Sequence, residues 1–324
     1  MGYHRPDRVE DAFQALAQGA SVIAGGTDWY PARGDGPVPQ NLLDITRLPQ
    51  FSGIARHDGG WRIGAATSWS AIVNADLPPA FAGLQAAGRE VGSVQIQNAG
   101  TIGGNLCNAS PAADGMPALL TLDAHVQLVS ATGTRRLPLA QFVTGARQTA
   151  LQSGELLQAI DIPDTWAAPG TGAAFAKLGA RKYLVISIAM VAAILRLNAG
   201  RVADARVAVG ACSAVAQRLG ALEAALQGAA PDEFAARVAQ APLTGLAPIA
   251  DVRGSAEYRL DAVRELVSRA LMTAAEAANE RSRHPPLWCR SLRHRILPER
   301  GKRCGQCPPG RAAVAVVARK AGQP

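Results

Sequence analysis

The sequence predicts an α+β fold made of an N-terminal α+β part and a C-terminal part that combines a small antiparallel sheet with helices. Three observations lead to this prediction. A helix, a strand, a glycine turn and a second strand follow one another at the N-terminus. Short strands and helices then alternate as far as residue 168. Beyond Pro169-Gly170, long apolar runs with two-residue breaks precede alanine- and leucine-rich helices.

The composition of the chain is typical of a packed globular protein. Its 324 residues are enough for one large or two ordinary domains, and 48% are hydrophobic while 18% are charged. No apolar stretch is both long and uninterrupted enough to cross a bilayer, and the first residues lack the apolar core of a secretory signal. We therefore expect a cytoplasmic protein without a membrane span.

The first 54 residues are predicted to form one small unit. Val9, Phe13 and Leu16 have helical spacing within residues 7–19, which end at a glycine. Short apolar runs at residues 21–24 and 41–45 predict two strands.

Residues 55–168 carry mixed signals for strands and helices. Thr132-Gly133 is a hairpin signal between two apolar runs, and the small residues at 98–105 predict a loop. Strands are predicted at residues 61–65, 125–130, 135–139 and 155–163, and helices at 69–74, 81–91 and 117–122.

A second domain is predicted over residues 171–280. Apolar runs separated by breaks such as Ala199-Gly200 indicate antiparallel strands, and the alanine-rich segments that follow have strong helix propensity. The strands are expected at residues 173–178, 186–198 and 202–209, and the helices at 218–227 and 258–278.

The positive charge of the chain is concentrated at its C-terminus. Residues 281–324 hold eleven Lys and Arg against one acid, which leaves 22 Lys and Arg against 24 acids in residues 1–280. Because the body is nearly neutral, the net charge of +8 does not indicate nucleic-acid binding by the fold. The basic segment lacks a helical period and is predicted to be a disordered or aberrant tail.

The cysteines do not indicate a disulfide framework or a metal site. Cys107 and Cys212 are far apart in the body and are expected to be free thiols. In the tail, Cys304 and Cys307 form a C-x-x-C pair with only irregular Cys and His neighbours, which is too weak a pattern to predict a metal centre.

Two glycine loops are the strongest candidates for a ligand site. One covers residues 24–28 after a strand, and the other covers residues 101–105. Glycine lets a ligand approach the backbone closely, and successive N–H groups can bind an anion. With Thr27, Thr101 and Asn105 as side-chain donors, both loops together could bind a diphosphate. A single Gly-Gly pair is more often a simple turn, and neither loop is a Walker A or G-x-G-x-x-G motif.

Segments around these loops resemble the FAD-binding, or medium, subunits of the xanthine dehydrogenase and carbon monoxide dehydrogenase family. The resemblance covers about residues 1–275, and the segment with the second loop is its most specific stretch. The matching segments are AGGTDWYP (24–31), LLDITRLPQFSGI (42–54), IGAATSWSAI (63–72), QNAGTIGGNLCNASPAADGMPALLTLDA (97–124), GELLQAIDIP (154–163), AFAKLGARKYLVISIAMVAA (174–193), RVAVGACSAVAQRLGALEAAL (206–226) and DVRGSAEYRLDAVRELVSRAL (251–271).

This resemblance implies a fold and a cofactor. The fold is the two-subdomain FAD-binding fold shared with vanillyl-alcohol oxidase and the MurB reductase, here at about residues 1–54 and 55–168 of a domain covering 1–168. Non-covalent FAD would lie extended between the subdomains. Residues 171–280 would form the family's C-terminal domain, a three-stranded antiparallel sheet with a helical bundle.

The resemblance also implies which residues contact FAD. Both loops would contact the diphosphate and its surroundings, Asp114 the adenosine ribose hydroxyls, Leu157 an apolar part of the cofactor and Lys177 the flavin ring. The loop residues are Val22, Ile23, Ala24, Gly25, Gly26, Thr27 and Asp28 in the first loop and Thr101, Ile102, Gly103, Gly104 and Asn105 in the second.

Several of these side chains also have a simpler explanation. Asp114 could be a turn or helix-cap residue, and Lys177 could be a solvated lysine on a strand. Trp29 and Tyr30 could stack on a ring, but turn aromatics more often serve packing. Cys107 is expected to behave as a small buried apolar residue.

The function implied by the resemblance is electron transfer inside a cytoplasmic heterotrimer. A molybdenum-cofactor large subunit would oxidise the substrate, a small subunit would carry two [2Fe–2S] clusters, and FAD in this chain would pass electrons to NAD⁺ or another acceptor. The body shows no catalytic triad or paired carboxylates, so we predict no catalytic residue and no metal ligand in it. A stand-alone FAD-dependent oxidoreductase of the same fold, or a flavin-free scaffold with a basic binding tail, remains an alternative.

Overall fold

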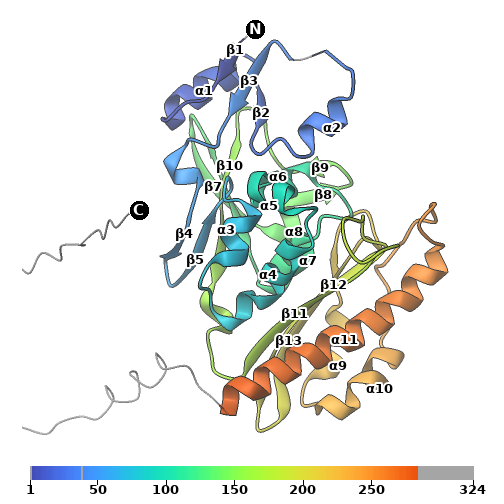
Figure 1. Ribbon diagram of the computed structural model, residues 1–324. Helices are drawn as coiled ribbons and strands as arrows, with labels where there is room; N and C mark the ends of the chain where they lie inside the picture. The colour runs from blue at the N-terminus through green and yellow to red at the C-terminus, as the bar shows by residue number, and fades with distance from the viewer. Residues whose placement is uncertain (1, 38, 284–324) are drawn as a thin grey trace, which may run out of the picture. The chain divides into compact units, whose positions relative to one another are not determined.

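A parallel three-stranded sheet forms the N-terminal end of the molecule in the computed structural model (Figure 1). The structure describes residues 2–37 and 39–283, so the predictions for the basic tail from residue 284 onward lie outside it. The strand order is β1 (Gly2–His4), β3 (Asn41–Asp44) and β2 (Ser21–Ile23). Helix α1 (Val9–Ala17) buries Ala12 and Ala15. The helix and two of the strands are as predicted, whereas β1 has no sequence signal.

A five-stranded antiparallel sheet follows. Its order is β4 (Ile54–His57), β5 (Gly60–Gly64), β10 (Leu156–Pro163), β6 (His125–Ser130) and β7 (Gly133–Pro138). The last two strands form the predicted hairpin, in which Ser130 pairs with Gly133. A two-stranded ribbon of β8 (Val143–Gly145) and β9 (Gln148–Thr149) follows the short helix α8 (Leu139–Phe142).

Helices lie over one face of this sheet, and most of them share the main hydrophobic core with it. They are α3 (Trp69–Asn74), α4 (Ala82–Arg89), α5 (Val94–Ala99), α6 (Ile102–Asn108) and α7 (Gly115–Thr121). The prediction of a loop at residues 98–105 is wrong, because α6 begins inside it. The hydroxyl of Thr101 accepts a hydrogen bond from the N–H of Gly104 at 3.0 Å and caps the helix, which offsets the low helix propensity of the glycines.

The C-terminal half contains an antiparallel sheet in the order β11 (Thr171–Leu178), β12 (Ala189–Asn198), β13 (Arg201–Gly210) and β14 (Gln217–Arg218). The three long strands match the prediction, although β12 begins at Ala189 and not at Ile186. The fourth strand, with two residues, was not predicted.

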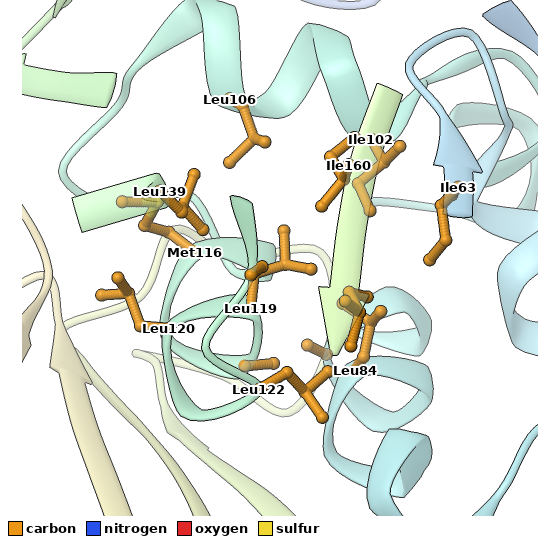
Figure 2. Close-up of a cluster of buried hydrophobic side chains, with 14 of the residues drawn as sticks. Ile63, Leu84, Ile102, Leu106, Met116, Leu119, Leu120, Leu122, Leu139 and Ile160 are labelled. Atoms are coloured by element: carbon orange, nitrogen blue, oxygen red, sulfur yellow. The ribbon is translucent and has the colours of Figure 1, made fainter. Parts of the chain in front are cut away.

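The sheet of β11 to β14 is covered on both faces. One face contributes Ala173, Ala192 and Ile194 to the main core around α4, α6 and α7, part of which is shown in Figure 2. The opposite face packs against α9 (Gly220–Leu226), α10 (Phe234–Gln240) and α11 (Ala256–Arg283). Double coverage explains why β12 is a continuous apolar run without alternation.

Helix α11 lies along the outer face of this sheet (Figure 1). It extends to Arg283, so the expected end near Ala278 is wrong by a little more than one turn. The remaining short elements are α2 (Trp29–Arg33) and the 3₁₀ turns at Pro49–Phe51, Pro79–Phe81, Asp164–Trp166 and Pro231–Glu233.

Replacing Gly172 should test this packing. A Cβ on Gly172 in β11 would lie 2.0 Å from the carbonyl oxygen of Ala274 in α11, so strand and helix must separate in Gly172→Ala. We expect a loss of about 1–3 kcal/mol in the free energy of unfolding, measured by denaturant titration. Gly220→Ala is the matched control, because nothing lies within 4 Å of its added methyl group. Equal stability of the two variants would contradict the close contact.

Candidate functional site

The first glycine loop leaves β2 and turns against the end of α5. Gly26 has φ +71°, a conformation that favours glycine. A Cβ on Gly25 would lie 1.7 Å from the carbonyl oxygen of Ala99 and 3.0 Å from the N of Gly100. Residues 25 and 99–100 therefore meet backbone to backbone, and only glycine at position 25 permits this contact.

The amide groups of the first loop are available to a ligand. Among the described residues, the N–H groups of Gly25, Gly26 and Thr27 donate to no protein acceptor. Three successive free donors in a turn form an anion-binding concavity. The diphosphate-binding role predicted for this loop is consistent with that arrangement.

The second loop contributes in a different way. Its amides already donate within the protein: Ile102 to Thr67 O at 3.0 Å, Gly103 to Ala65 O at 2.8 Å and Asn105 to Thr101 O at 3.0 Å. This differs from the prediction that backbone N–H groups of both loops bind the anion, because these amides of the second loop have protein acceptors. What it offers a ligand is a small-residue surface and the side chain of Asn105, whose buried Oδ1 has no partner.

Both loops line one cavity of about 1080 Å³, which we call the groove. This volume is slightly above the roughly 300–1,000 Å³ that is typical of small-molecule and cofactor sites. The prediction that the two distant loops lie together is confirmed. The contacts assigned to individual residues remain predictions.

Most of the predicted site residues line the groove, but two do not. Ile102 is fully buried in the main core, and Lys177 lines a neighbouring cavity of about 420 Å³. The residues found at the groove are Val22, Ile23, Ala24, Gly25, Gly26, Thr27, Asp28, Thr101, Gly103, Gly104, Asn105, Asp114 and Leu157.

Asp114 and Lys177 form a buried ion pair beside the groove. The ammonium of Lys177 donates to Asp114 Oδ2 at 2.8 Å and to the carbonyl of Glu90 at 3.2 Å, and the Ser187 hydroxyl donates to Asp114 Oδ1 at 2.7 Å. The side chains of Lys177 and Asp114 are 6% and 10% exposed. Burial raises the pKa of the Asp114 carboxyl, and the ammonium of Lys177 and the Ser187 hydroxyl oppose that rise.

This pair contradicts the simpler explanations of both residues. The Asp114 side chain makes no helix-cap hydrogen bond, and Lys177 is not a solvated strand lysine. The roles assigned to Asp114 at the ribose and to Lys177 at the flavin ring remain predictions. In the structure both oxygens of Asp114 already have protein partners.

Two arginines at the groove were missed by the sequence reasoning. Arg33 and Arg147 line it, and neither is ion-paired with a carboxylate among the described residues. Arg147 has φ +61° in the turn between β8 and β9 and donates to Asn108. No local signal marks either residue: Arg33 ends helix α2, shortly after the first glycine loop, and Arg147 lies in the turn between β8 and β9.

The connection between β11 and β12 also reaches the groove. Leu184, Val185 and Ile186 line it, although Leu184 and Ile186 remain 53% and 54% exposed. The aromatic rings of Trp29 and Tyr30 pack edge to face at 5.0 Å, and Trp29 lines the groove. Cys107 is exposed at the groove, so its expected burial is wrong.

These features fit an extended dinucleotide with two phosphates. Three free amides and two arginines without a carboxylate partner among the described residues match the negative charge of a diphosphate. Apolar residues such as Leu157 and Val91 provide contacts for rings, and the unpartnered oxygen of Asn105 provides an acceptor. The donor set is thus suited to FAD, the cofactor that the resemblance implies.

In residues 2–37 and 39–283, no cluster of three His, Cys, Asp or Glu side chains could hold a metal ion. Within those ranges no helix has the length and apolar character needed to cross a membrane.

Two family models match the chain. The FAD binding domain in molybdopterin dehydrogenase matches residues 1–165, and the CO dehydrogenase flavoprotein C-terminal domain matches residues 174–274. Together they cover all three large sheets described above.

Individual relatives align along most of the chain. The 6-hydroxypseudooxynicotine dehydrogenase complex subunit alpha of Paenarthrobacter nicotinovorans is 33% identical over 84% of this chain and 93% of its own. The xanthine dehydrogenase FAD-binding subunit of Escherichia coli O157:H7 is 29% identical over 85% and 96%. The solved structure of carbon monoxide dehydrogenase from Hydrogenophaga pseudoflava matches with a TM-score of 0.77 and 31% identity, covering 86% of this chain and 98% of that one.

The buried ion pair beside the groove should be strongly coupled. Asp114→Asn leaves the ammonium of Lys177 buried without a counter-ion, so we expect a loss of about 3–5 kcal/mol in the free energy of unfolding at neutral pH. Adding Lys177→Met removes the unpaired charge and should recover part of that loss. Denaturant titration of the two single variants and the double variant measures the coupling, and additive losses would show that the pair is not coupled.

Proposed function

We propose that this chain, which belongs to the family of FAD-binding subunits of molybdenum hydroxylases, transfers electrons within a larger complex. It would receive them from [2Fe–2S] clusters on a partner subunit and deliver them to NAD⁺ or another acceptor. Substrate oxidation takes place on a partner subunit that holds the molybdenum cofactor.

The observation that carries this proposal is the meeting of two glycine loops across one groove. The loops are about 75 residues apart in sequence, and Gly25 places the first directly on the backbone that precedes the second. A groove built this way has walls made of backbone and small side chains, which suits the close approach of a long, polar cofactor.

We assign the binding of FAD, without a covalent bond, to the groove residues named above. The free amides of Gly25, Gly26 and Thr27, with Arg33 and Arg147, would hold the diphosphate. Leu157 and the residues around Val91 would exclude water from the apolar parts. When bound, FAD supplies a centre that exchanges electrons singly or in pairs.

The Asp114–Lys177 pair would act at the edge of the bound cofactor. Its partners, Ser187 and the carbonyl of Glu90, hold both charges in fixed positions. A fixed charged pair in a largely buried place affects the redox potential of a neighbouring group more strongly than the same pair in water would.

The partners proposed for this chain follow from its relatives. Those relatives are a subunit alpha, an FAD-binding subunit and a chain of carbon monoxide dehydrogenase, and their names give different substrates. We infer that the substrate is selected by the large subunit and not by this chain. We also propose a cytoplasmic heterotrimer with one large and one small partner, and no role in nucleic-acid binding.

A visible absorption spectrum tests the proposal. The full-length chain, isolated through an affinity tag with whatever co-purifies, should show the visible absorption bands of oxidised flavin. It should also contain molybdenum and iron in proportion to the flavin. In Gly25→Ala the new methyl group must displace the Ala99 carbonyl, so we expect bound flavin to fall by about tenfold or more.

Gly220→Ala is the control for Gly25→Ala, because its methyl group points into open space. A colourless wild-type preparation would contradict the flavoprotein assignment. A yellow preparation without molybdenum or iron would instead favour a stand-alone FAD-dependent oxidoreductase. Reoxidation of the reduced complex by NAD⁺ under anaerobic conditions tests the proposed acceptor separately.

A further inference from the structure

Residues 179–187 make up most of the connection between β11 and β12, and the carbonyl of Ile188, which follows them, accepts a hydrogen bond from a residue that does not line the groove. We propose that Arg259 in α11 is a positioning residue that fixes this segment, and through it the contact between the Ser187 hydroxyl and Asp114. On this view retention of the cofactor depends on Arg259. The inference rests on the proposed function, since it assumes that the groove holds FAD.

The segment of residues 179–187 is anchored at its two ends and strained between them. The N–H of Ile188 donates to the carbonyl of Leu178 at 2.8 Å and closes its base. Leu184 has φ +53°, an unfavourable conformation for a branched side chain, and its carbonyl accepts a hydrogen bond from Arg181 Nε at 3.1 Å. A strained segment keeps one conformation only when its surroundings hold it.

Arg259 supplies that restraint from the C-terminal helix. Its side chain is 3% exposed. Its guanidinium donates to the carbonyl of Ile188, to the carbonyl of Ala211 at 3.1 Å and to Asp251 Oδ1 at 2.7 Å. Ile188 directly follows Ser187, so this fork fixes the backbone beside the hydroxyl that donates to Asp114.

The planar guanidinium of Arg259 binds these acceptors with two nitrogens, because Nη1 donates to both carbonyls and Nη2 donates to Asp251. A lysine ammonium carries the same charge, but its single nitrogen cannot span two carbonyls and a carboxylate in these positions. Arg259 is absent from the lining of the groove, so it contacts neither FAD nor the residues assigned to the diphosphate. Any effect of Arg259→Lys on the cofactor must therefore be transmitted through the protein.

The same helix offers a matched control. Arg264 also donates to three carbonyls, those of Val238, Ala239 and Ala241 at 2.6 to 3.2 Å, and these lie at the end of α10. Arg264→Lys makes the same change in the same helix, yet it leaves the 179–187 segment untouched. Comparing the two variants separates the contacts of Arg259 from the general effect of replacing an arginine of α11 with lysine.

The experiment measures the rate at which FAD leaves the tagged full-length complex, followed as the rise in flavin fluorescence after dilution. We expect roughly tenfold faster release in Arg259→Lys and in Ser187→Ala, the size of effect for one lost hydrogen bond to a charged group. The double variant should release FAD no faster than either single variant, because both act through one contact. Arg264→Lys should release FAD at the wild-type rate.

Three results would overturn the inference: wild-type retention in Arg259→Lys, multiplied rates in the double variant, or equally fast release in Arg264→Lys. If Arg259→Lys does not fold, Asp251→Ala removes one of its three acceptors and should speed release about threefold, again without adding to Ser187→Ala. A wild-type complex that holds no flavin would instead contradict the proposed function itself.

Discussion

The groove depends on one contact that only glycine allows, the approach of Gly25 to the carbonyl of Ala99. This contact joins the N-terminal sheet to the helices of the five-stranded sheet at the point where the first loop turns. The amides of residues 25–27 donate to no protein acceptor among the described residues, whereas the carbonyl of Gly26 accepts a hydrogen bond from the N–H of Tyr30 at 3.0 Å. The binding surface and the joint between the two sheets are therefore made by the same residues.

The sequence was sufficient for the features that are written locally. Periodicity and turn residues predict helix α1, strands β2 and β3 and the β6–β7 hairpin. The apolar run of β12 also predicts a strand, and burial of that strand on both faces explains why its residues do not alternate. It failed at residues 98–105, where glycine-rich composition suggested a loop but the Thr101 cap begins α6. The helix cap by Thr101 offsets the low helix propensity of Gly103 and Gly104. The amino-acid composition of the segment does not show that this cap forms.

The candidate site also has parts that the sequence predicts and parts that it does not. The two loops were predicted because their residues are contiguous and the family motifs around them are specific. The ion pair of Asp114 with Lys177 and the approach of Arg147 to Asn108 join residues 63 and 39 positions apart. Neither has a local signal, since both arise from how sheets and helices pack. The local charge at the groove is likewise independent of the net charge, which is concentrated in the C-terminal tail.

The sheet of β11 to β14 is covered by the helices of the N-terminal half on one side and by α9, α10 and α11 on the other. Neither half can bury its own apolar residues alone, because each supplies the cover for the other. A gene split near residue 170 would release two products with an exposed apolar face each, and such faces favour aggregation. The two halves of this chain must therefore be inherited together.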